Sequence, residues 1–174
     1  MDSQQRKLPL EDHLSDDQFK AIGLVIAEWA AIERSLLYIL CDLTLPNTPE
    51  YENYAPALLL ATGMNYRTLL GLMVAIAQVR FPSDTKEFQK ILDDLQNSAS
   101  KRDIFAHSAW SRGKKADAIG SVQLKSVGGI KQTTREYTTS EIRQVAIEMH
   151  ERIHALSDFL KARSAWHDPP TTAA

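Results

Sequence analysis

The chain has 174 residues, of which 44% are hydrophobic and 24% are charged, a composition that excludes a fibrous or wholly disordered protein. Its 20 Lys and Arg residues nearly balance its 22 Asp and Glu residues, so net charge alone does not indicate a nucleic acid, membrane or acidic partner. Cys41 is the single cysteine, which excludes an intramolecular disulfide and a multi-cysteine zinc site and favours a reducing, cytoplasmic environment.

The two ends of the chain and its apolar runs predict a soluble intracellular protein. Residues 1–14 lack the apolar segment of a secretory signal, and the longest apolar run, residues 69–77, is too short to cross a bilayer. We expect a flexible N-terminus over residues 1–14, a single helical-bundle domain over residues 15–166 and a flexible tail over residues 167–174. We expect no membrane contact.

The first long helix is predicted to begin at Ser15, because Ser15 and Gln18 have the spacing of a capping box. Steps of three and four residues then place one line of side chains along a single face up to about Cys41. That line consists of Phe19, Ile22, Ile26, Trp29, Glu33, Leu36 and Leu40. Glu33 is its charged member.

The middle of the chain is predicted to hold a loop and two further helical pieces. Residues 45–56 are predicted to form a loop because they contain Pro46, Asn47, Pro49 and Pro56, and a short helical piece is predicted over residues 57–61. Residues 65–80 are apolar on nearly every side, which is typical of a helix surrounded by other helices. We therefore expect residues 65–80 to form the central helix.

A third main helix is predicted to start at Ser83 or Asp84 and to end near His107. Its apolar spacing places Arg102 in line with core residues; the line is Phe88, Ile91, Leu95, Ser98, Arg102 and Phe105. Residues 108–137 then change character, because apolar and polar residues alternate on either side of a Gly-Gly pair at 128–129. This pattern predicts a β-hairpin.

The last helix is predicted to open with a capping box of Thr138 and Glu141. One side of it carries Ile142, Val145, Met149, Ile153, Leu156 and Leu160. The fold class expected from these elements is mainly α, a four-helix bundle with a small β-hairpin between the third and fourth main helices.

Positive charge is concentrated in residues 101–135, which carry eight basic and two acidic residues, a net charge of +6, against −8 for the rest of the chain. A patch of this kind suits a phosphate-bearing ligand. The candidate RNA-binding residues are Arg112, Lys114, Lys115, Lys125, Lys131, Arg135 and Trp110. The alternative is a solvated hairpin whose lysines prevent edge pairing, with the tryptophan serving for packing.

The string Arg102-Asp103-Ile104-Phe105-Ala106-His107 closes the third helix and combines groups suited to phosphodiester cleavage. A guanidinium can bind a phosphate through two hydrogen bonds, and an imidazole can transfer a proton near neutral pH. Asp103 lies four residues before His107, the spacing that lets a carboxylate orient the imidazole. Arg102 lies about 140° around the helix from His107, so two copies facing each other would be needed to converge both groups.

This string, together with the segment Trp29 to Glu33 and the order of helices, resembles the HEPN superfamily of small helical-bundle proteins. The resemblance implies a homodimer whose signatures face each other, and metal-independent endoribonuclease activity with no cofactor. By position it implies an active site of Arg102, Asp103 and His107. Aspartate stands where the family more often has asparagine, and residues 108–137 are outside the family's minimal bundle. Such a toxin-like nuclease can have a neutralising protein partner.

The family also contains inactive members, which leaves a second hypothesis. In it the chain is a non-catalytic interaction or nucleic-acid-binding module, and Arg102 forms a structural ion pair with Glu33. The two hypotheses differ in whether RNA is cleaved.

A rival motif lies in the last helix, where His150-Glu151-Arg152-Ile153-His154 satisfies the H-E-x-x-H pattern of zinc peptidases. Its surroundings do not fit, because Ser157 and Leu160 stand where a metzincin has glycine and a third ligand. A zinc hydrolase using His150, Glu151 and His154 is therefore a remote alternative. A single E-x-x-H is likewise incomplete for a di-iron bundle, and we expect no metal site.

Overall fold

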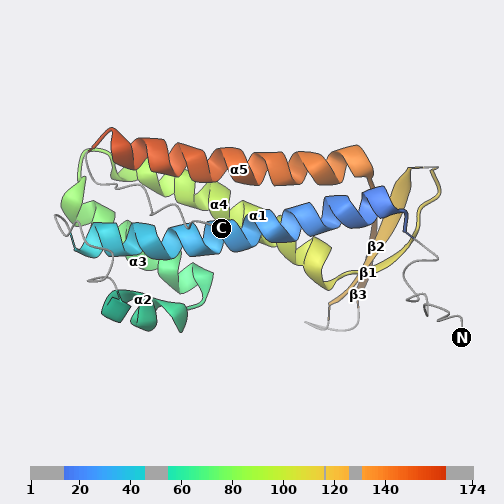
Figure 1. Ribbon diagram of the computed structural model, residues 1–174, viewed down its shortest axis with the longest axis horizontal. Helices are drawn as coiled ribbons and strands as arrows, with labels where there is room; N and C mark the ends of the chain where they lie inside the picture. The colour runs from blue at the N-terminus through green and yellow to red at the C-terminus, as the bar shows by residue number, and fades with distance from the viewer. Residues whose placement is uncertain (1–13, 46–54, 116, 126–130, 164–174) are drawn as a thin grey trace, which may run out of the picture. The chain divides into compact units, whose positions relative to one another are not determined.

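The computed structural model describes residues 14–45, 55–115, 117–125 and 131–163, and within them it contains five helices and three strands (Figure 1). The helices are α1 (Asp16–Thr44), α2 (Ala55–Thr62), α3 (Tyr66–Arg80), α4 (Thr85–His107) and α5 (Thr139–Lys161). The strands are β1 (Ala109–Arg112), β2 (Ala118–Lys125) and β3 (Lys131–Thr138). The mainly helical class with a small β excursion is confirmed. The tail predicted at residues 167–174 lies outside the described residues, as does the N-terminus up to residue 13, whereas Leu14 is buried.

The chain forms two compact units, one of Met1–Trp29 with Ala99–Glu148 and one of Ala30–Ser98 with Met149–Ala174. The boundary between them falls within α1, α4 and α5. The first unit contains all three strands, and the second contains α2 and α3.

In the first unit, β1, β2 and β3 form an antiparallel sheet in that order. The predicted hairpin corresponds to β2 and β3, while its turn, residues 126–130, lies outside the described residues. Strand β1 was not predicted, because four residues are too few to show the alternation of apolar and polar side chains that is typical of a strand. Just after β1, the Gly113 amide donates to the Ala118 carbonyl (2.9 Å), and glycine is required there because a Cβ atom would overlap that carbonyl.

Helix α1 begins with the predicted capping box. The Ser15 amide donates to Gln18 Oε1 (2.8 Å), and the Gln18 amide donates to Ser15 Oγ (3.3 Å). The buried face, however, is displaced from the predicted line. The buried residues of α1 are Gln18, Ala21, Val25, Trp29, Ile32, Leu36, Ile39, Leu40, Cys41, Asp42 and Leu43. Ile26 and Glu33, which belong to the predicted line, are exposed. The charged residue of that line therefore lies outside the buried face of α1.

The expectation that residues 65–80 form a helix surrounded on all sides is wrong. Residues 66–80 do form a helix, which Asn65 caps by accepting from the Thr68 amide (3.0 Å), but only one face of the helix is buried. Leu72 and Val79 are exposed, Val79 by 83%. The loop predicted up to residue 56 is also shorter, because α2 begins at Ala55 and places Pro56 in its first turn, where the missing N–H breaks no helical hydrogen bond.

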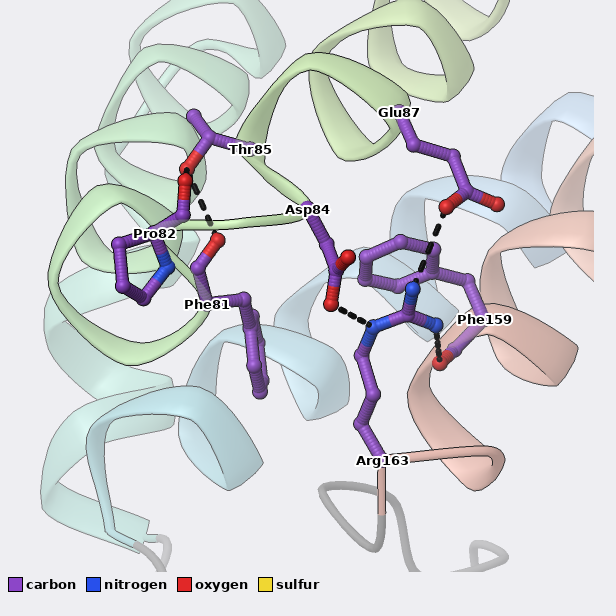
Figure 2. Close-up of polar contacts among 7 residues, drawn as sticks. All are labelled: Phe81, Pro82, Asp84, Thr85, Glu87, Phe159 and Arg163. Atoms are coloured by element: carbon purple, nitrogen blue, oxygen red, sulfur yellow. Dashed lines mark hydrogen bonds and ion pairs between the residues drawn. The ribbon is translucent and has the colours of Figure 1, made fainter.

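In the second unit, Arg163 ties the end of α5 to the start of α4 (Figure 2). Its guanidinium donates to Asp84 Oδ2 (2.8 Å), to Glu87 Oε2 (3.2 Å) and to the Phe159 carbonyl (3.0 Å). The guanidinium carbon also lies 3.6 Å from the centroid of the Phe159 ring. Asp84, which lies just before α4, therefore links the start of α4 to the residues that follow α5.

Candidate active site at the end of helix α4

Arg102 is held in a fixed position by two neighbours in the first unit. Its guanidinium carbon lies 5.3 Å from the centroid of the Trp29 ring, and Trp29 itself is only 2% exposed. Arg102 Nη1 also contacts Asp103 Oδ1 at 3.1 Å, while 20% of the Arg102 side chain remains exposed. The guanidinium is thus ordered by a cation–π contact and an ion pair, while part of the side chain remains exposed.

His107 is exposed in the last turn of α4. The predicted hydrogen bond from Asp103 to His107 is not formed among the described residues, because the Asp103 carboxylate contacts Arg102 instead. The spacing of four residues allowed either arrangement, and the adjacent guanidinium offered the carboxylate a full positive charge. In this structure the Asp103 carboxylate therefore contacts the Arg102 guanidinium.

Trp110 forms part of an aromatic cluster where β1 leaves the end of α4. Its ring stacks on Phe105, with centroids 5.7 Å apart and planes inclined by 14°, and it meets Tyr137 edge-on at 6.4 Å. Phe105 and Tyr137 also contact each other, at 5.1 Å. Packing is thus the observed role of Trp110, which is half-buried.

The basic residues are spread over the sheet and its first turn. Four of them are exposed, namely Arg112, Lys114, Lys115 and Arg135. Arg135 lies 4.9 Å from the Tyr137 ring centroid. Lys125 and Lys131 face each other in the register of β2 and β3, and their side chains lie outside the described part of the chain. Arg112, at the end of β1, is followed closely by Lys114 and Lys115, and Arg135 lies in β3.

The first unit also contains a pocket of about 220 Å³ that the sequence did not predict. It is lined by Lys101, Ile104, Phe105, Arg135, Tyr137, Glu141, Gln144, Val145 and Glu148. An ion pair of 2.6 Å joins Lys101 Nζ to Glu148 Oε2. Burial raises the pKa of Tyr137, and Glu141 raises it further. Arg102, Asp103 and His107 do not line this pocket. Its walls come from α4, β3 and α5, so no local sequence pattern could have indicated it.

Glu33 lies in the second unit, where it is exposed and lines a pocket of about 270 Å³ with Leu37, Ala61, Thr62, Met64, Tyr66 and Leu69. An ion pair with Arg102 would join the two units. That pair stays a prediction.

The H-E-x-x-H residues lie together on α5 in the second unit. His150, Glu151 and His154 are exposed, and the Nε2 atoms of the two histidines are 3.1 Å apart. Within the described ranges, no group of three or more His, Cys, Asp or Glu side chains is placed to hold a metal ion. The set of ligands and base that a zinc peptidase needs is therefore incomplete here.

Burial raises the pKa of the Cys41 thiol to about 11, with a further contribution from Asp42. This thiol is therefore protonated at neutral pH and is not a nucleophile.

Comparison of the chain with protein-family models, with curated proteins and with solved structures found no match. Over the part of the chain that the structure describes, no helix combines the length and apolar character needed to cross a membrane.

Proposed function

We propose that this chain is a metal-independent endoribonuclease of the HEPN type. In this proposal α1, α3, α4 and α5 form a four-helix bundle, and two copies pair so that their Arg102 and His107 side chains face one RNA backbone. The protein would act in the cytoplasm, where Cys41 stays a thiol. A neutralising protein partner would then be expected, as for a toxin-like nuclease.

The observation that supports this proposal best is the accessibility of both groups at the end of α4. His107 is exposed, and Arg102 is ordered by Trp29 and Asp103 while a fifth of its side chain reaches solvent. An imidazole that exchanges protons with substrate must be accessible, and a guanidinium that stabilises charge works best when it is already oriented.

The reaction follows from the chemistry of these groups. His107 would accept the proton of a ribose 2′-hydroxyl, whose oxygen attacks the adjacent phosphorus. Arg102 would stabilise the negative charge that develops on the phosphorane oxygens, and Asp103 would hold Arg102 in place. The P–O5′ bond then breaks, the departing oxygen takes a proton from water, and His107 returns its proton to solvent, which yields 2′,3′-cyclic phosphate and 5′-hydroxyl ends.

Arg112, Lys114, Lys115 and Arg135 would bind flanking phosphates, because they are exposed cations of the segment that follows α4. Lys125 and Lys131 would extend this contact along β2 and β3. Trp110 could add a stacking contact only through the part of its ring that the aromatic cluster leaves open.

The deciding experiment is cleavage of a mixed single-stranded RNA pool in the presence of EDTA. We expect cyclic-phosphate products, and we expect His107→Ala to lower the rate by about 100-fold or more, the usual contribution of a general base. Arg102→Lys should also lower it strongly, because an ammonium cannot form the paired hydrogen bonds of a guanidinium. Arg102→Ala should abolish cleavage.

The matched control is His150→Ala, which removes another exposed histidine on α5 and should leave cleavage unchanged. Circular dichroism and light scattering would establish that each variant is folded and that the wild-type chain has twice the mass of one chain. Wild-type rates in a folded His107→Ala protein, or a monomeric active protein, would contradict the proposal.

A second candidate function is a non-catalytic nucleic-acid-binding or interaction module. The contact of Arg102 with Trp29 and the absence of a described hydrogen bond between Asp103 and His107 favour it. This candidate predicts RNA binding without turnover, and binding that is insensitive to His107→Ala.

A further inference from the structure

Two imidazoles lie side by side on the exposed surface of α5. His150 and His154 are one helical turn apart, within the second unit, and both are exposed. Their Nε2 atoms are 3.1 Å apart, and their ring centroids are 4.4 Å apart with planes inclined by 63°. The Nε2 atoms of both rings therefore lie close together on the exposed surface of α5.

The separation of the two nitrogens matches the bite of a chelating pair. Imidazole nitrogens lie about 2.0–2.1 Å from the metal ions that they bind, so two nitrogens 3.1 Å apart subtend an angle of about 95° at a shared ion. This angle is close to that of two neighbouring positions in octahedral or square-planar coordination. The same distance also fits one hydrogen bond between the rings, whose proton a metal ion would replace.

We propose that His150 and His154 together bind one divalent late transition-metal ion through their Nε2 atoms, with water in the remaining positions. Neutral imidazole selects ions such as Ni²⁺, Cu²⁺ and Zn²⁺, whereas Mg²⁺ and Ca²⁺ prefer oxygen ligands. The site has two protein ligands, since no cluster of three is present in the described residues. It requires neither the ribonuclease activity nor a catalytic role for Glu151.

The test is calorimetric titration of the metal-free full-length chain with Ni²⁺. We expect one ion to bind per chain, with no competition from millimolar Mg²⁺. Loss of a group that only hydrogen-bonds to a metal ligand weakens metal binding by about 10- to 100-fold. Because His150 and His154 are themselves the proposed ligands, His150→Ala and His154→Ala should each weaken Ni²⁺ binding by at least about 10-fold. His107→Ala should bind Ni²⁺ as the wild type does.

A matched control keeps the number of histidines and changes only their geometry. The double variant His154→Ala with Ala155→His places the second imidazole five residues from His150, about 140° around the helix. Ala155 is exposed, so the helix should tolerate this exchange. We expect it to bind Ni²⁺ as weakly as His154→Ala. Wild-type affinity in the double variant, or no saturable Ni²⁺ binding by the wild type, would overturn the proposal.

Discussion

The side chain of Arg102 combines a structural contact with a proposed chemical role. Its position in an otherwise apolar line of α4 is explained by Trp29, whose buried ring faces the guanidinium. Partial burial of a cation above an indole ring costs less free energy than burial elsewhere in a core, because the negative face of the ring replaces part of the cation's hydration. The pairing with Asp103 then fixes the direction of its hydrogen-bond donors.

The contact between Arg102 and Trp29 should be measurable by a double-mutant cycle. We expect Trp29→Leu and Arg102→Met to be coupled by about 0.5–2 kcal/mol in the free energy of unfolding, the range found for cation–π pairs that are partly removed from water. Urea denaturation of the four proteins would give this value. Strict additivity of the two single substitutions would show that the contact contributes no net stability.

At the scale of elements, hydrogen bonds between near neighbours determine where helices begin. At the start of α5, Glu141 Oε2 accepts from the Thr138 amide (2.7 Å) and from Thr138 Oγ1 (3.0 Å), and the Glu141 amide donates to Thr138 Oγ1 (3.2 Å). These bonds lower the pKa of Glu141 below its ordinary value, and the positive charges of Arg135 and Lys115 lower it further. The folded state therefore favours the carboxylate form.

Thr138→Ala should lower the free energy of unfolding by about 1 kcal/mol at pH 7, the usual cost of removing a capping hydroxyl. Because the pKa of Glu141 is lowered in the folded state, the stabilisation from its carboxylate is present above its ordinary value of 4.5 and is lost as the pH falls through the lowered value. The deficit of Thr138→Ala should shrink over that range. Ser140→Ala, an exposed neighbour outside the capping box, is the control, and denaturation at several pH values is the measurement.

The cluster around Arg163 links two elements that are distant in sequence (Figure 2). Hydrogen bonding to Arg163 is the main reason that the pKa of Asp84 lies below its ordinary value. The pair therefore stabilises the fold above pH 3.8, and this contribution is lost as the pH falls through the lowered pKa.

Arg163→Gln should lower the melting temperature at pH 6, and the difference from the wild type should narrow below pH 3.8. Lys86→Gln removes an exposed cation from the first turn of α4 and should change little. Thermal unfolding followed by circular dichroism at both pH values would check this expectation. An equal difference at both pH values would mean that Asp84 is not the partner that matters.

For the whole molecule, the uneven distribution of charge along the chain matters more than the small net charge. Residues 101–135 carry +6, and the rest of the chain carries −8. Cations that bind phosphates release condensed counterions, so a positive segment makes RNA affinity fall as salt rises. The exposed cations of the sheet supply such a segment.

The salt dependence of RNA binding should report how many of these cations touch phosphate. The slope of log K against log salt changes by about 0.7 for each contact to a single strand, so Lys114→Gln with Lys115→Gln should reduce the slope by about 1.4. The pair Lys86→Gln and Lys90→Gln, exposed on α4 in the second unit, should leave it unchanged. Fluorescence anisotropy with a short labelled RNA at several salt concentrations gives the slope, and equal reductions by both pairs would indicate only a general charge effect.

The amino-acid sequence alone determined the features that depend on neighbours within four residues. Both capping boxes and the two strands on either side of the Gly-Gly pair were predictable, because their hydrogen bonds and alternation are local. The same locality explains why α4 could be followed to His107 from spacing alone.

The tertiary structure alone decided which of two adjacent lines of side chains on α1 is buried, and Glu33 lies outside the buried line. It also added β1, turned Asp103 towards Arg102 instead of His107, and assembled the pocket beside Lys101 from three elements. Each of these results depends on contacts between segments far apart in the chain, or on a choice between neighbours of nearly equal reach. The spacing of residues in the sequence limits which contacts are possible, and the free energies of apolar burial and charge pairing determine which of those contacts form.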